Sequence, residues 1–278
     1  MTRRVELGEQ AAGRAIADVR VRSTADQIRE LRAAITMLTR LPVGSTSGEA
    51  SGARAFGLAG ALVGLAGFVP LVVLGAAVAP AAAILAVGAM AVLSGALHLD
   101  GLADTADALV AVGPHATERA RKDPSIGVGG AAALILVLGL EVASLTVLAA
   151  GPGPLVAGLA CLIGGAGSRV APVVIARFAR SRATSGGLGA WFSRRVTNAD
   201  AGLAASTGVV VAMVAAVAGT SPALLVGGLV GFAAGIGLGL ALVRLRGQLD
   251  GDGLGATVEL SFAAILVSTA AIIRWPVA

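Results

Sequence analysis

The sequence contains few charged residues, few aromatic residues and almost no cysteine. Only 13% of its 278 residues are charged and 3% are aromatic, tyrosine is absent, and Cys161 is the one cysteine. Soluble domains usually carry about 25% charged residues, so this composition excludes an ordinary water-soluble globular protein, a disordered chain and a coiled coil. A single cysteine also excludes a disulfide-stapled scaffold.

Apolar residues and glycine are abundant instead. Hydrophobic residues make up 56% of the chain, glycine occurs 40 times, and the mean hydropathy is +0.88. A membrane-spanning helix needs about 20 apolar residues. Seven runs approach or exceed that length, and they predict an all-α, polytopic membrane protein: 55–78, 81–98, 129–150, 153–176, 202–219, 222–243 and 257–274.

The segment before the first apolar run divides into two parts. Residues 1–25 form a polar extension, and residues 26–278 form the membrane domain. Within the domain, apolar residues recur at helical spacing and predict an N-terminal amphipathic helix; they are Ile28, Leu31, Ile35 and Leu38. Such a helix either lies on the membrane surface or packs on the loops, and the sequence leaves both open.

The basic residues are distributed unevenly along the chain. Nineteen of the 21 precede the first span or lie in the three long breaks at 99–128, 177–201 and 244–256. The positive-inside rule therefore predicts a cytoplasmic (inner) membrane protein whose N-terminus and long loops face the cytoplasm. The net charge is +5 and the pI is near 11.1. Because the positions of the basic residues are explained by the membrane topology, we expect no nucleic-acid partner.

The acidic residues gather on the same side, and the densest stretch follows the second span. On a helix, Asp100, Asp104 and Asp107 would share one face. Three like charges repel one another there unless a cation lies between them, and oxygen ligands suit Mg²⁺. The sequence therefore predicts that these residues are catalytic and bind the metal. The alternative is a solvated loop that is merely acidic.

Two further stretches supply groups for a charged substrate. Asp252 and Glu259 lie in a glycine-rich segment and add ligands for a second cation. Arg119, Lys122 and Ser125 precede a helix, where side-chain charge and backbone N–H groups favour phosphate. The alternative to a phosphate site at Arg119, Lys122 and Ser125 is a flexible loop whose positive charges only determine the membrane topology.

The order and content of these motifs resemble a known family. The stretch 97–107 resembles the signature of the adenosylcobinamide-GDP ribazoletransferase, or cobalamin synthase, family. Five further stretches resemble other motifs of that family, in family order: 38–42, 122–127, 168–171, 187–189 and 251–260. The resemblance covers about residues 30–262, and it identifies residues 26–278 as an integral membrane ribazoletransferase domain.

The resemblance implies a reaction and a cofactor. Adenosylcobinamide-GDP and α-ribazole, or its 5′-phosphate, would give adenosylcobalamin, or its phosphate, and GMP, with Mg²⁺ as the cofactor. Metal ions shield a pyrophosphate and stabilise the leaving phosphate. We expect Asp100, Asp104 and Asp107 to hold Mg²⁺, Asp252 to add to the metal site, and Arg119 and Lys122 to steady the phosphates. The lipid bilayer is the other expected partner, and a homo-oligomer is left open.

Two other functions compete with this interpretation. A CDP-alcohol phosphotransferase-like enzyme would use the same chemistry, but its pattern has an Ala-Arg pair that residues 98–107 lack. A transporter would place polar residues at the bilayer midplane, and only Glu141 fits that position well. Glu141 and Arg169 lie inside spans, and we interpret them as a structural pair across adjacent helices.

Overall fold

The computed structural model describes residues 24–44, 50–111, 113, 125–184 and 186–274. Within these ranges the regular secondary structure is entirely helical. Seven helices are long and apolar enough to cross a membrane, which confirms the all-α fold and the number of spans. Most of the predicted 1–25 extension lies outside the described residues.

The spanning segments are 19–25 residues long, with mean hydropathies of 1.7–2.3. The helices themselves are α3 (Phe56–Leu74), α4 (Ala79–Ser94), α7 (Val128–Ala150), α8 (Pro154–Phe178), α10 (Asn198–Ala218), α11 (Pro222–Arg246) and α12 (Gly251–Arg274). Short 3₁₀ turns extend two of them, η1 (Ala53–Ala55) before α3 and η2 (Ala76–Val78) before α4.

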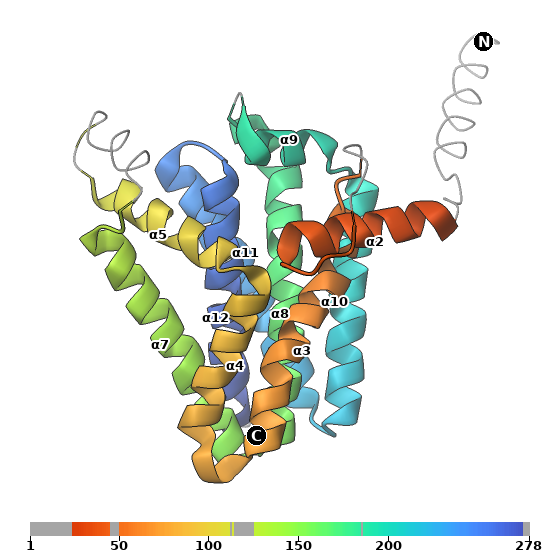
Figure 1. The fold of residues 1–278 in the computed structure, drawn as a ribbon, viewed down its shortest axis with the longest axis vertical. Helices are drawn as coiled ribbons and strands as arrows, with labels where there is room; N and C mark the ends of the chain where they lie inside the picture. Colours follow the sequence, from red (N-terminus) through yellow and green to blue (C-terminus); the bar gives the residue numbers. More distant parts are fainter. Residues whose placement is uncertain (1–23, 45–49, 112, 114–124, 185, 275–278) are drawn as a thin grey trace, which may run out of the picture.

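Three shorter helices lie at one end of the bundle, the top in Figure 1. They are α2 (Thr24–Leu38), α5 (Leu97–Val110) and α9 (Gly187–Arg195), the last preceded by η3 (Arg180–Arg182). We call this end the acidic end, because Asp100, Asp104 and Asp252 belong to helix segments there. The tight turns after α3, α7 and α10 lie at the opposite end (Figure 1).

The predicted amphipathic helix corresponds to α2. Its inner face buries Ala34 and Leu38 against the spans, whereas Ile28 is 52% exposed. A carboxylate oxygen of the buried Glu30 accepts a hydrogen bond of 2.9 Å from the Gly52 amide. This bond ties α2 to the start of the first span.

The seven spans alternate in direction, so the two ends of the membrane domain differ. Helix α3 begins at the acidic end, and α12 finishes at the opposite end. Arg274, the last residue of α12, lies near Gly151 in the turn between α7 and α8. The odd number of spans thus separates α2 from the end of α12.

Helix α8 occupies the centre of the bundle, and glycines allow its neighbours to approach closely. A Cβ at Gly60 of α3 would lie 2.3 Å from the Gly165 carbonyl oxygen of α8. A Cβ at Gly231 of α11 would lie 2.3 Å from the Ile265 Cα of α12. Small residues at helix interfaces permit this backbone-to-backbone packing in membrane proteins.

The last span begins earlier than the sequence predicts. Helix α12 starts at Gly251 rather than at residue 257. Glycine weakens an isolated helix by about 1 kcal/mol relative to alanine, so a glycine-rich run resembles a loop in the sequence. Here the run is helical because α5 packs on it, with a Cβ at Gly101 falling 2.9 Å from the Asp252 carbonyl oxygen.

Candidate active site

The chain turns sharply between α4 and α5. Gly95 and Ala96 both adopt left-handed backbone conformations, with φ of 63° and 56°. Alanine rarely adopts this conformation, so the surrounding structure must hold the turn in place. Helix α5 then carries Asp100, Asp104 and Asp107 away from the spans, so these residues meet the condition under which the sequence places them on one face.

Asp252 of α12 lies within electrostatic reach of the carboxylates on α5. Partial burial raises the pKa of Asp104, and the negative charges of Asp100, Asp252 and Asp107 raise it further. The guanidinium of Arg246 opposes this rise in pKa. Two helices that are distant in sequence therefore bring carboxylates together at the acidic end.

Asp107 has a different environment from the other two carboxylates of α5. Its two oxygens accept hydrogen bonds from the Gly127 and Gly130 amides, at 2.8 and 2.9 Å. Gly127 immediately precedes α7 and Gly130 lies in its first turn, where unpaired N–H groups favour an anion. Asp107 therefore caps α7 and ties it to α5.

Of the three predicted phosphate-binding residues, the structure describes only Ser125. Arg119 and Lys122 lie outside the described residues. Ser125 is exposed just before α7. The sequence predicts that an anion binds at this helix start. In the structure the anion is the Asp107 carboxylate, which accepts hydrogen bonds from the Gly127 and Gly130 amides.

The start of α12 is held by a residue that the sequence interpretation did not select. Asp250 accepts hydrogen bonds from both terminal nitrogens of Arg246, at 2.6 and 2.8 Å, and from the Gly253 amide at 2.9 Å. The last bond spans three residues, as in an N-cap. An aspartate just before a helix is a capping signal that the sequence contains, but it is recognised only if the helix is expected to begin at Gly251 rather than at residue 257. The cap fixes Asp252 two residues later.

Glu259 lies two turns further along α12, in a buried cluster below the acidic end. Its Oε1 is 3.9 Å from the His98 Nδ1. Burial, together with the charge of Arg169, lowers the pKa of His98 to about 3. His98 is therefore neutral at physiological pH and forms no ion pair with Glu259. Glu259 is also not among the charges that shift the pKa of Asp104.

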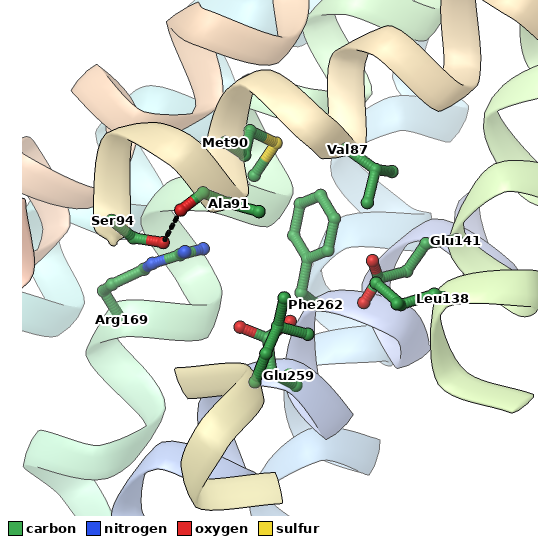
Figure 2. A pocket seen from close by; sticks show the side chains of 10 residues that line it. Val87, Met90, Ala91, Ser94, Leu138, Glu141, Arg169, Glu259 and Phe262 are labelled. Atoms are coloured by element: carbon green, nitrogen blue, oxygen red, sulfur yellow. Dashed lines mark hydrogen bonds between the residues drawn. The ribbon is translucent and has the colours of Figure 1, made fainter. Parts of the chain in front are cut away.

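Glu141 and Arg169 belong to the same buried cluster. Figure 2 shows them at one small cavity of about 20 Å³ that Glu259 also lines, with the Phe262 ring between Arg169 and Glu141. The Glu141 Oε1 and the Arg169 Nε have no hydrogen-bond partner in the described part of the chain, so these two atoms do not bond to each other. Arg169 instead donates to the Ser168 hydroxyl at 2.9 Å, since the ring occupies the space between the charges.

Within the described ranges, no three His, Cys, Asp or Glu side chains are grouped closely enough to form a metal site as they stand. The donor set nevertheless suits a hard cation, because Asp100, Asp104 and Asp252 offer only carboxylate oxygens and their charges repel one another. Asp107 and Glu259 were also predicted as ligands, but Asp107 caps α7 and Glu259 lies beside His98 in the buried cluster.

A family model described as cobalamin-5-phosphate synthase matches residues 30–270. The chain belongs to the cobalamin-5-phosphate synthase family. It is therefore a membrane-embedded transferase of cobalamin synthesis, and the resemblance of its sequence motifs to that family is confirmed.

Curated relatives agree with this assignment. The chain is 35% identical to the adenosylcobinamide-GDP ribazoletransferase of Sinorhizobium medicae, over 84% of this chain and 92% of the relative. It is 32% identical to the protein of the same name from Klebsiella pneumoniae, over 87% and 99% of the two chains. A Nocardioides protein of that name is 35% identical over 69% and 73%. No solved structure matches the chain.

In this member of the family, the acidic residues at the acidic end fall into two groups that have different partners. Asp100, Asp104 and Asp252 form the accessible acidic group, whereas Asp107 and Asp250 cap helices. The residue types alone do not distinguish these roles. The distinction depends on which backbone amides each helix start presents to a carboxylate.

Proposed function

We propose that the chain is an adenosylcobinamide-GDP ribazoletransferase whose reaction takes place at Asp100, Asp104 and Asp252. The substrates would be adenosylcobinamide-GDP and α-ribazole or its 5′-phosphate, as the names of the relatives suggest. The observation that carries this assignment of the site is the convergence of carboxylates from α5 and α12, whose charges add to the effect of burial in raising the pKa of Asp104.

The cofactor that we propose is Mg²⁺, held by the carboxylates of Asp100, Asp104 and Asp252. When bound, it would offset the negative charge of the pyrophosphate and of the departing GMP. Burial raises the pKa of Asp104 and the charges of Asp100, Asp252 and Asp107 add to this rise, so a cation here would relieve the repulsion among the carboxylates. Asp107 is left out of the set because its oxygens already bond to two amides at the start of α7. Glu259 is left out because it lies in the buried cluster with Glu141 and Arg169.

The reaction breaks a phosphoanhydride bond and forms a phosphate ester bond in its place. A ribose hydroxyl oxygen of the acceptor forms a bond to the cobinamide-side phosphorus, and the bond from that phosphorus to the bridging oxygen breaks. The bridging oxygen leaves on GMP with the electron pair. The hydroxyl proton passes to one of the carboxylates of the acidic group, which acts as the general base.

Phosphate binding and orientation complete the proposal. Arg119, Lys122 and Ser125 would steady the phosphates, and the acidic end would face the cytoplasm. The protein would lie in the cytoplasmic (inner) membrane. Nineteen of the 21 basic residues precede the first span or lie in the long connections, and the positive-inside rule favours the cytoplasm for that side.

The test is GMP release by the detergent-purified protein supplied with adenosylcobinamide-GDP, α-ribazole and Mg²⁺. We expect release only when both substrates and the metal are present, and a loss of at least about 100-fold in Asp104→Asn. No release from folded protein would contradict the proposed function, and CDP-alcohols would then be the next substrates to try. Full activity in Asp104→Asn would move the site elsewhere.

A further inference from the structure

A cavity of about 340 Å³ opens beside the acidic group. Its size falls in the range of small-molecule sites, roughly 300–1,000 Å³. Six helices contribute to its wall, namely α2, α3, α5, α8, α9 and α12. Asp100 and Asp252 both line it, so whatever occupies the cavity lies next to the proposed reaction centre.

The wall is mainly apolar. Of its sixteen residues, nine have apolar side chains and four are glycines, leaving His98, Asp100 and Asp252 as the polar ones. One side is aromatic, because Phe56 and Phe192 stack with ring centroids 5.1 Å apart and an interplanar angle of 19°. An apolar, partly aromatic wall with polar groups on a few residues suits a flat ring that carries a polar substituent.

Helix α9 is fixed onto this wall by backbone contacts. A Cβ at Gly189 would lie 2.5 Å from the Asp250 carbonyl carbon, so α9 packs directly against the start of α12. The segment before α9 also bonds to the connection between α11 and α12, with the Leu249 amide donating to the Arg182 carbonyl at 2.7 Å. Leu188 and Phe192 are thereby held in the cavity wall.

We propose that this cavity binds the aromatic base of the nucleoside acceptor, a benzimidazole-type ring, and that Leu188 and Phe192 contribute to selecting it. This inference rests on the proposed function. With the base in the apolar cavity, the attached ribose lies beside Asp100 and Asp252, where its hydroxyl must react. Holding the two reactants in this way supplies the proximity that a transfer reaction needs.

The other parts of the two substrates fit the cavity less well. Guanine carries several hydrogen-bonding groups on its edges, and burying them against apolar side chains is costly. The corrin ring with its amide side chains is much larger than a nucleoside base and is polar around its rim. A benzimidazole-type base is flat and almost wholly apolar, as the wall requires.

The test is the variant Leu188→Trp, which fills part of the cavity. Leu188 is 52% exposed, so the larger side chain can be accommodated without disrupting the fold. We expect the KM for α-ribazole to rise at least about tenfold, with the KM for adenosylcobinamide-GDP unchanged. Equilibrium dialysis of α-ribazole alone, without the second substrate, should show the same weakening of its Kd.

The matched control is Leu245→Trp. Leu245 is 75% exposed near the end of α11 and does not line the cavity, so both KM values should stay at their wild-type values. If Leu188→Trp does not fold, Leu97→Phe provides the same test, because Leu97 also lines the cavity and is 43% exposed.

Two results would overturn the inference. A rise in the KM for adenosylcobinamide-GDP alone would assign the cavity to the nucleotide-activated substrate, and unchanged KM values for both would leave it without a substrate. A wild-type protein that binds α-ribazole but releases no GMP would instead contradict the proposed function. In that case the dialysis comparison still decides whether the cavity binds the base.

Discussion

Asp104 and Asp107 lie one turn apart on α5, yet their side chains have different partners. Asp107 bonds to two amides of α7, whereas Asp104 is surrounded by the charges of other carboxylates. A carboxylate that caps a helix stabilises the fold, whereas one among like charges destabilises it until a cation binds. Their removal should therefore change stability in opposite directions.

We predict that Asp107→Ala lowers the free energy of unfolding by about 1–2 kcal/mol, the usual cost of losing a helix cap. Thermal unfolding in detergent without added Mg²⁺ measures this change. Asp104→Ala is the matched control and should leave the stability unchanged or slightly raised. A stable Asp107→Ala protein with a strongly increased Mg²⁺ requirement would instead make Asp107 a metal ligand, as the sequence alone predicts.

At the scale of helices, glycine lets α11 and α12 pack with their backbones close together. Gly231 faces the backbone of α12, where a Cβ would lie 2.3 Å from the Ile265 Cα. Gly237 is in the same helix, but a Cβ there would meet nothing within 4 Å. The two positions separate the packing role of glycine from its effect on helix propensity.

We predict that Gly231→Ala lowers the free energy of unfolding by about 1–3 kcal/mol, because the new methyl group overpacks the interface. Gly237→Ala should leave it unchanged or raise it by up to about 1 kcal/mol, because alanine favours the helix. Chemical or thermal unfolding of the two variants in the same detergent makes the comparison. Equal effects at both positions would contradict the close packing of α11 and α12.

The helices show what the sequence could and could not predict. The spans follow from hydropathy, because the bilayer sets their length. The carboxylate spacing is compatible with α5 but does not by itself predict a helix there. For the helical run from Gly251 the sequence offers only the cap at Asp250, because the glycines disfavour an isolated helix and the run is stabilised by packing against Gly101. The capping role of Asp107 likewise depends on α7, whose amides are 20 or more residues away.

At the scale of the whole molecule, the fold separates two unlike ends. The acidic end holds α2, α5 and α9, and the opposite end holds the tight turns (Figure 1). The charge pattern predicts that the acidic end faces the cytoplasm. Cys161, the single cysteine, is fully buried, so cysteines introduced at the two ends can report on this orientation.

We predict that Thr220→Cys is labelled in intact cells by a membrane-impermeant maleimide, because Thr220 is exposed in the turn after α10. Ser181→Cys, exposed at the acidic end, should be labelled only after the cells are opened. The unaltered protein controls for Cys161 and should not react. The reverse labelling pattern would place the acidic end outside the cytoplasm.

The central claim is that α5 and α12 jointly form one catalytic site, and a double-mutant cycle tests it most directly. Rates of GMP release would be measured for Asp104→Asn, Asp252→Asn and the variant with both changes. Residues that act as one unit are strongly non-additive, so each single variant should lose at least about 100-fold and the double variant little more. A nearly wild-type rate for Asp252→Asn, or losses that multiply in the double variant, would contradict a shared site.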